Sequence, residues 1–156
     1  MKITLIAAHD PNLLIGAEGG LPWRYPEDLK HFKKHTLDQT VVMGRGVFEE
    51  LNEIPLPGRR NIVLSTSKVY DHVATYTSLD DVLQVLDDVS EVFIIGGGVL
   101  YNQTLPIADR LIITEIKKEY MGDTFFPEYR NMIGIMWREV KRDDHDDLAF
   151  VEYERI

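Results

Sequence analysis

The chain has 156 residues, which is enough for one domain with its own hydrophobic core and too few for two such domains. Hydrophobic residues make up 44% of the chain and charged residues 28%, which excludes the composition of a disordered protein. The formal net charge of −9 argues against a nucleic-acid-binding surface, and the lack of cysteine excludes disulfides and thiolate sites.

The N-terminal stretch MKITLIAAHD carries no targeting signal or membrane span. It reaches charged residues and a proline within about ten residues, too early for the apolar region of a signal peptide. We therefore expect a cytoplasmic protein that has neither a membrane nor a nucleic acid as a partner.

Short apolar runs rich in β-branched residues predict four buried strands, at 3–8, 40–44, 61–66 and 91–97. Helical patterns are predicted at 26–35, 47–51, 79–85 and 100–105. This alternation of strands and helices indicates a mostly parallel sheet with helices on both faces.

The last third of the chain has strand-like runs without long helices between them, at 110–116, 137–143 and 148–156. The acidic run 143–147 predicts a solvated turn, and so an antiparallel hairpin of the last two strands. The predicted fold is therefore α/β, a single domain over residues 1–156 with a mostly parallel central sheet and this hairpin at its edge. In such sheets ligands bind at the carboxyl ends of the strands.

Two strand-to-helix turns are candidates for phosphate binding. Gly96, Gly97 and Gly98 precede one predicted helix, and Gly44 and Arg45 precede another. Glycines allow a ligand to approach the backbone closely, and arginine adds a permanent cation. A tight turn without a ligand explains either one alone, but together they indicate one ligand with several phosphates.

Two further segments each allow a functional and a plain interpretation. The long connection 8–23 is either a lid hinged at its glycines or an ordinary surface loop. The segment 55–67 offers arginines for a carboxylate and hydroxyls for a phosphate, although paired surface arginines are commonly only solvated.

Asp28 lies in the first turn of the helix predicted at 26–35, close to Leu29 and Phe32. An acid there either complements the helix dipole or, at the pocket end of an apolar face, accepts two hydrogen bonds from an amidine-like ligand edge. His31 and His35 have the spacing of a zinc pair, but no glutamate stands between them and we expect no metal.

Eight motifs follow one another along the chain: LIAAHDPNLLIG, LPW, DLKHFKKHT, VVMGR, LPGRRNIVLS, VFIIGGGVLY, LIITEI and GDTFFPEY. In this order they resemble dihydrofolate reductase, over about residues 3–129. The resemblance implies that family's fold and its reaction, in which NADPH reduces dihydrofolate to tetrahydrofolate while the pterin is protonated. The product supplies one-carbon metabolism and thymidylate and purine synthesis.

The resemblance implies roles for residues on the substrate side. Asp28 would grip the amino group and ring NH of the pterin, Thr114 would share that network, and water would deliver the proton. Leu21 and Trp23 would belong to a lid that closes over the nicotinamide. Arg59 would hold the carboxylate of the glutamate tail. The other implied substrate-binding residues are Ala8, Leu29, Phe32 and Leu51.

The resemblance also implies that NADPH is the cofactor. The backbones of Ala8 and Ile15 would hold the nicotinamide's amide, while Arg45 and Thr66 would contact the 2′-phosphate. The family has a cis peptide within its glycine pair, here Gly96–Gly97. The implied cofactor-binding residues are Ala8, Ile15, Gly44, Arg45, Gly46, Val47, Leu64, Ser65, Thr66, Ile95, Gly96, Gly97, Gly98, Val99, Leu100 and Tyr101.

Three positions depart from the family pattern. Val47 and Glu50 stand where the family usually has a threonine and a serine, and Val99 stands where some members have an arginine for the 2′-phosphate. We still expect a monomeric, NADPH-dependent dihydrofolate reductase. Two alternatives are a binding module that has lost hydride transfer and a related reductase that acts on a pyrimidine intermediate of flavin synthesis.

Overall fold

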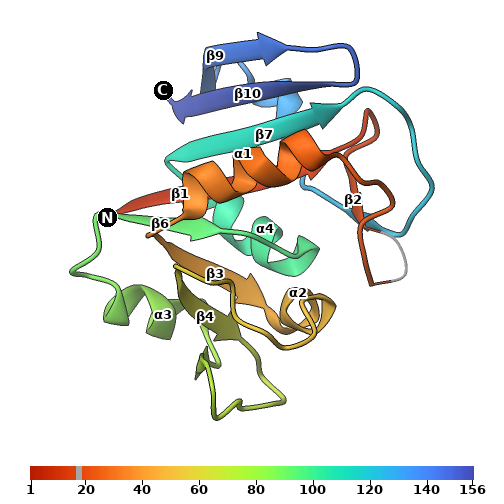
Figure 1. The fold of residues 1–156 in the computed structure, drawn as a ribbon. Coiled ribbons are helices and arrows are strands. Elements are labelled where there is room, and N and C mark those ends of the chain that lie inside the picture. Colours follow the sequence, from red (N-terminus) through yellow and green to blue (C-terminus); the bar gives the residue numbers. More distant parts are fainter. Residues whose placement is uncertain (17–18) are drawn as a thin grey trace.

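The computed structural model describes residues 1–16 and 19–156 (Figure 1). Its main strands are β1 (Lys2–His9), β3 (Thr40–Gly44), β4 (Arg60–Leu64), β5 (Ala74–Tyr76), β6 (Glu91–Ile94), β7 (Arg110–Ile116), β9 (Trp137–Asp144) and β10 (Leu148–Arg155). They form one eight-stranded sheet in the order β5-β4-β3-β6-β1-β7-β10-β9. Two further strands, β2 (Leu14–Gly16) and β8 (Thr124–Phe125), pair with each other.

The strand directions confirm the predicted architecture. The strands from β5 to β7 run parallel to their neighbours, whereas β10 runs antiparallel to both β7 and β9. The C-terminal hairpin therefore completes one edge of the sheet. All residues of β9 after Trp137 are exposed and most are charged, which protects this edge from pairing with another chain.

Four helices cover the sheet: α1 (Pro26–Thr36), α2 (Arg45–Glu50), α3 (Leu79–Val85) and α4 (Gly98–Thr104). The first begins at a proline, whose missing N–H costs nothing in a first helical turn. The Ser78 hydroxyl caps α3 by accepting a hydrogen bond from the Asp81 amide at 3.1 Å. In the described part of the chain, no helix is both long and apolar enough to cross a membrane.

The hydrophobic core has a main layer on each face of the sheet. Alternate residues of β3 show the division: Val41 and Met43 belong to the layer that contains Phe48 of α2, whereas Val42 belongs to the layer that contains Leu100 of α4. Helix α1 lies on the same face as α2, and α3 on the same face as α4 (Figure 1). The prediction of helices on both faces is confirmed.

The glycine turn after β6 differs from its predicted boundaries. The strand predicted at 91–97 ends at Ile94, and Gly96 has a φ of 122°, which only glycine adopts without strain. The Gly96–Gly97 peptide is cis, as the family resemblance implies. The following helix begins at Gly98, earlier than the predicted residue 100.

Candidate active site

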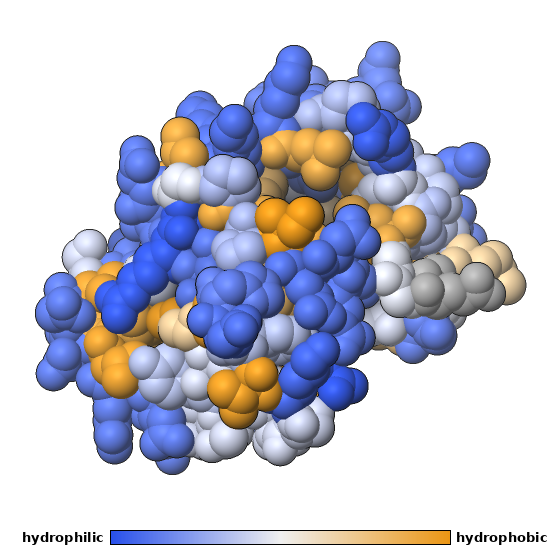
Figure 2. All heavy atoms as spheres, turned by 60° about the horizontal axis from the view of Figure 1, so that its bottom comes forward, coloured by the Kyte–Doolittle hydropathy of each residue, from blue (hydrophilic) through white to orange (hydrophobic). Residues whose placement is uncertain are grey.

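Two adjoining cavities open at the carboxyl ends of β1, β3, β4 and β6, as expected for a sheet of this type. The smaller cavity has a volume of about 270 Å³ and is lined by residues of α1. The larger has a volume of about 740 Å³ and is lined by the first turns of α2, α3 and α4. On the face shown in Figure 2, apolar side chains form patches among hydrophilic ones, and one patch borders a hollow.

Asp28 lies in the first turn of α1 and lines the smaller cavity. Its Oδ1 atom accepts a hydrogen bond from the Thr114 hydroxyl of β7 at 2.6 Å, the only hydrogen bond that its side chain makes with a described residue. Burial raises the pKa of Asp28, although the bond from Thr114 acts to lower it. A carboxylate in this position keeps acceptor capacity for a ligand.

Most of the residues that the sequence assigned to the substrate lie together. Ala8, Leu29, Phe32 and Leu51 line the smaller cavity with Asp28. Leu29 is 48% exposed, so this apolar side chain is left for a ligand to cover. The cavity therefore combines apolar walls with the partly buried carboxylate of Asp28 at one end of α1.

Arg59 lies near the other end of α1. Its guanidinium donates hydrogen bonds to the Pro57 carbonyl at 2.9 Å and to the Thr36 hydroxyl at 3.1 Å, and it lines neither cavity. Partial burial lowers the pKa of Arg59, but an arginine stays charged at any working pH. A ligand would have to extend along the helix to reach both Asp28 and Arg59.

The residues assigned to the cofactor divide between the two cavities. Those in the smaller cavity are Ala8, Ile15, Ile95, Gly96 and Tyr101. The Tyr101 hydroxyl donates a hydrogen bond to the Ile6 carbonyl at 2.7 Å, and its complete burial raises the pKa of this phenol. Those in the larger cavity are Gly44, Arg45, Gly46, Leu64, Ser65, Thr66, Gly98, Val99 and Leu100.

The larger cavity has the chemistry of a site for a phosphorylated ligand. Gly46 faces open space, which leaves its backbone accessible. Arg45 donates a hydrogen bond to the Ser67 hydroxyl at 2.7 Å and pairs with Glu49 at 3.3 Å, so its cation is held beside the cavity. A cation, several hydroxyls and open glycine backbone together fit a nucleotide cofactor.

Four residues line both cavities: Val47, Glu50, Gly97 and Thr124. We call them the shared wall. The Glu50 side chain makes no hydrogen bond or ion pair with any residue in the described ranges, and partial burial raises the pKa of its carboxyl. Two of the departures from the family pattern, Val47 and Glu50, therefore lie where ligands in the two cavities would meet.

The connection 8–23, which the sequence suggests as a lid, includes residues 17–18, which lie outside the described residues. Leu21 lines the smaller cavity and is 57% exposed. Trp23 lines neither cavity and is buried behind the cleft against Leu14 and Ile116. Its indole Nε1 makes no hydrogen bond with a described residue, so a water or ligand group is expected there.

The two histidines of α1 lie together and pack against the sheet. Their ring centroids are 4.6 Å apart, and the ring of His31 stacks on Phe150 of β10 at 4.1 Å. Burial lowers the pKa of His31 to about 4 and also lowers that of His35, which keeps both rings neutral at pH 7. Within residues 1–16 and 19–156, no group of three or more suitable side chains could hold a metal ion.

Sequence reasoning missed several lining residues. Ser78 and Asp80 at the start of α3 line the larger cavity, and Leu56 lines the smaller one. The capping pattern of Ser78 predicts where a helix begins but not what it faces. Leu56 and Thr124 carry no local signal, because only the folded chain brings their segments to the cleft.

The fold and the cleft together define a class of protein. A carboxylate in an apolar cavity suits a flat heterocyclic ligand with N–H donors, and the polar cavity across the shared wall suits a phosphorylated cofactor. This is the arrangement of an α/β oxidoreductase that binds a nucleotide cofactor beside its substrate.

Comparison with known proteins gives the family. The family model described as dihydrofolate reductase matches residues 2–155. The chain is 47% identical over 147 residues to dihydrofolate reductase type 3 of Salmonella typhimurium, covering 93% of this chain and 88% of that protein. It is 38% identical over 159 residues to dihydrofolate reductase of Bacillus subtilis, covering 98% and 94%.

A solved structure gives the same result. The dihydrofolate reductase from Enterococcus faecalis complexed with NADP(H) and RAB-propyl matches this fold with a TM-score of 0.89 and 34% sequence identity, covering 99% of this chain and 96% of that one. The chain therefore belongs to the dihydrofolate reductase family. It is an NADPH-dependent oxidoreductase that reduces 7,8-dihydrofolate to 5,6,7,8-tetrahydrofolate, and the predicted family, reaction and cofactor are confirmed.

Proposed function

We propose that Asp28 orients the pterin for reduction, and the observation that carries this proposal is its hydrogen bond with Thr114 inside the smaller cavity. Thr114 fixes one carboxylate oxygen, and the remaining acceptor capacity can bind the amino group and ring N–H of the pterin. The negative charge favours the protonated ring, and the proton reaches the reacting nitrogen through water.

The rest of the substrate lies along α1 in this proposal. Phe32, Leu29 and Leu51 cover the pterin and the adjoining benzoyl ring, which their position in the apolar cavity supports. Arg59 holds the carboxylate of the glutamate tail, and its place near the opposite end of α1 from Asp28 supports this role.

NADPH, when bound, supplies the hydride. The backbones of Ala8 and Ile15 hold its amide, and the glycine turns at 44–47 and 96–98 hold its diphosphate. Arg45 and Thr66 bind the 2′-phosphate. Ser65 supports this turn from behind, because its hydroxyl already accepts hydrogen bonds from the amides that follow it.

Leu21 and Trp23 act as part of a lid that excludes water from the reacting atoms. Leu21 does so from the wall of the smaller cavity, and Trp23 supports it from behind.

The chain acts as a monomer in the cytoplasm without a nucleic-acid partner. The net charge of −9 supports the absence of a nucleic-acid partner. The absence of cysteine supports the cytoplasm, because a chain without disulfides needs no oxidising compartment.

The test follows NADPH absorbance with purified protein and dihydrofolate, and repeats the assay with NADH. Asp28→Asn removes the charge but keeps the shape, and turnover at pH 7 should fall by about 100-fold or more, with a smaller loss at low pH where the substrate is already protonated. Asp146→Asn, in the exposed hairpin turn, is the matched control and should keep full activity. Full activity of Asp28→Asn at pH 7 would contradict the assigned role.

A further inference from the structure

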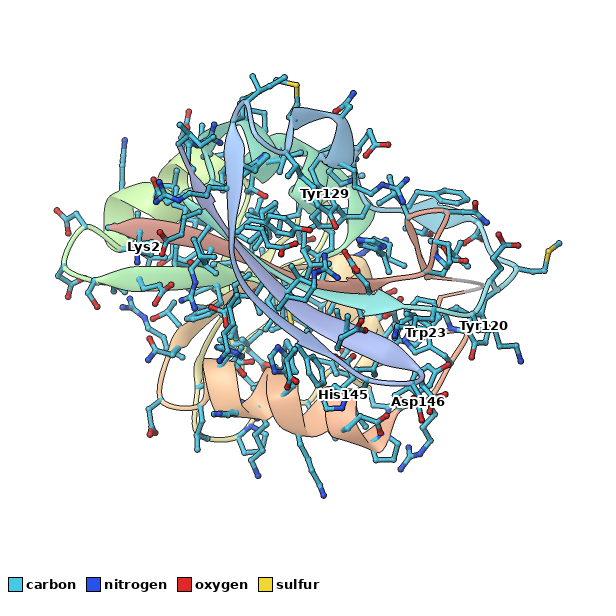
Figure 3. All side chains as sticks on the ribbon, turned by 90° about the horizontal axis from the view of Figure 1, so that it is seen from above. Lys2, Trp23, Tyr120, Tyr129, His145 and Asp146 are labelled. Atoms are coloured by element: carbon cyan, nitrogen blue, oxygen red, sulfur yellow. The ribbon has the colours of Figure 1, made fainter. Side chains whose placement is uncertain are left out.

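Tyr120 lies in the connection between β7 and β8 and contacts the lid segment, which we define as the described residues among 10–25. Three separate parts of Tyr120 make these contacts: its ring, its hydroxyl and its backbone N–H. Figure 3 shows Trp23 and Tyr120 together at the same end of the molecule, away from Tyr129. A single residue therefore joins both ends of the lid segment.

The ring of Tyr120 packs on Trp23. The ring centroids are 5.3 Å apart at an interplanar angle of 57°, within the range of a favourable aromatic pair. Trp23 is 8% exposed, and Tyr120 is one of the side chains that cover it. The orientation of the indole, and with it the segment from Leu21 to Trp23, depends on this ring.

The hydroxyl of Tyr120 shares a hydrogen bond with the hydroxyl of Tyr25 at 2.8 Å. Tyr25 directly precedes α1, and its carbonyl accepts hydrogen bonds from the amides of Asp28 at 3.0 Å and Leu29 at 3.2 Å. This bond raises the pKa of Tyr25 to about 12, so the Tyr25 phenol stays protonated at neutral pH. The Tyr120 hydroxyl is therefore bonded to the residue whose own carbonyl holds the first turn of α1, the turn that carries Asp28.

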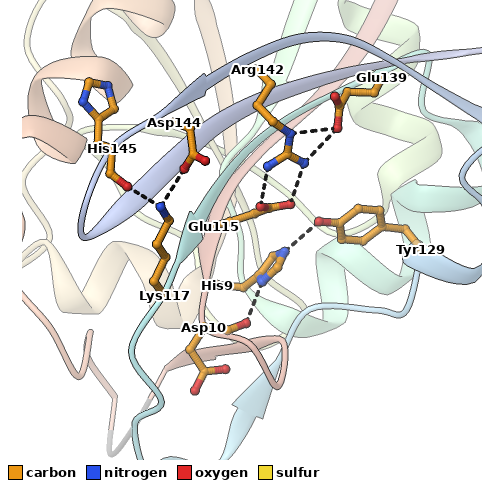
Figure 4. A network of polar contacts seen from close by, with 9 residues as sticks. All are labelled: His9, Asp10, Glu115, Lys117, Tyr129, Glu139, Arg142, Asp144 and His145. Carbon is orange, nitrogen blue, oxygen red and sulfur yellow. Dashed lines mark hydrogen bonds and ion pairs between the residues drawn. The ribbon is translucent and has the colours of Figure 1, made fainter.

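The backbone N–H of Tyr120 donates to the carboxylate of Asp10 at 3.0 Å. Asp10 is fully buried, and its other oxygen accepts from the amides of Asn12 at 2.8 Å and Leu14 at 2.9 Å. Its carbonyl is bonded to the ring of His9 (Figure 4). Tyr120 therefore holds the start of the lid segment at Asp10 as well as its end at Trp23 and Tyr25.

We propose that Tyr120 is a positioning residue for the reaction. Through its contacts with Trp23, Tyr25 and Asp10 it fixes the position of the lid segment relative to the first turn of α1. The proposal rests on the proposed function of the lid. Removing the Tyr120 hydroxyl should make the lid segment more mobile relative to α1. Hydride transfer should then slow, because a closed lid excludes water from the reacting atoms. Binding of the ligands away from the lid should change little.

The test is a double-mutant cycle on the full chain with Tyr25→Phe, Tyr120→Phe and both together, read by single-turnover hydride transfer. Each single variant should lower the rate constant about fivefold, the usual effect of one hydrogen bond, and the double variant by the same factor because all three lack the same bond. Kd for adenosine 2′,5′-bisphosphate, which occupies only the larger cavity and so touches no residue of the lid segment, should stay within about twofold, a split that general destabilisation would not produce.

Tyr70→Phe is the matched control, because the Tyr70 hydroxyl is buried without a hydrogen-bond partner in the described residues and packs beside Phe48. It should leave hydride transfer unchanged. Amide hydrogen exchange at residues 19–25 of the ligand-free protein gives a second measurement. Exchange there should be faster in Tyr25→Phe and in Tyr120→Phe than in the wild-type protein. Unchanged exchange and rate in Tyr120→Phe, or effects that multiply in the double variant, would overturn the proposal.

The exchange measurement separates this proposal from the proposed function of the lid. If both Tyr25→Phe and Tyr120→Phe transferred hydride at the wild-type rate, the proposed function of the lid would fail. Faster exchange in both variants and not in Tyr70→Phe would then still support the contact between Tyr120 and the lid segment, and unchanged exchange would reject it.

Discussion

Asp28 shows at the scale of one residue how a functional group costs stability. Burial raises its pKa above the value of an unfolded chain, so the folded state binds more protons between the two pKa values. Stability therefore falls as the pH rises through that interval, and the cost is fully present above the pKa of the folded state. The carboxylate is kept where an uncharged side chain would be more favourable.

We expect Asp28→Asn to have a higher Tm than the wild-type protein at pH 7, because the amide is neutral and its oxygen can still accept the hydrogen bond from Thr114. The difference should shrink as the pH falls below about 4, where the wild-type carboxyl is protonated in both states. Thermal unfolding at a series of pH values measures it, with Asp146→Asn as the exposed control. A variant that is less stable at pH 7 would contradict this account.

Some site residues could be predicted from the sequence and others could not, for a physical reason. Asp28 and the glycines of 96–98 follow local rules of helix starts and strand ends, so their place at the cleft could be inferred. No such local rule predicts the position of Trp23. It is buried behind the cleft and packs on the ring of Tyr120, a residue far away in the sequence. Leu56 lines the smaller cavity only because the loop before β4 folds back toward it.

At the scale of elements, the long strands and α1 were predictable and the shortest strands were not. β2, β5 and β8 have two or three residues each, too few to show a hydrophobic period. β2 and β8 exist because Leu14 pairs with Phe125 and Gly16 with Thr124. Their formation depends on tertiary contacts across more than half of the chain and not on local preference.

Helix α3 gives a prediction at this scale. Ser78→Ala removes the oxygen that accepts the Asp81 amide, and should lower the free energy of unfolding by about 1 kcal/mol. Ser78→Asp keeps an acceptor and should restore most of this loss. Urea unfolding of the three proteins measures it, and equal stability of Ser78→Ala and wild type would show that the cap contributes nothing.

The whole molecule carries 26 acidic and 17 basic residues. Some of the excess charge is balanced locally, as where Arg142 bridges Glu115 at 3.0 Å and Glu139 at 2.8 Å (Figure 4). These pairs are partly exposed and contribute little each. Repulsion between the remaining acids is therefore the larger electrostatic effect on stability.

Raising NaCl to about 0.5 M should increase Tm, because salt shortens the range of this repulsion. Thermal unfolding in NaCl and in an equal osmolality of glycerol separates screening from a general solute effect. A Tm that falls as NaCl rises would mean that attractive pairs such as Arg142 with Glu115 dominate instead.

The shared wall makes the two ligands energetically dependent on each other. Whichever ligand binds first completes part of the boundary of the other's cavity at Val47, Glu50, Gly97 and Thr124. Any resulting gain or loss in affinity is reciprocal, since thermodynamic coupling acts equally in both directions. A substitution in this wall that is selected for excluding a competitor of one ligand thus also retunes the other, and adaptation here must satisfy two binding partners at once.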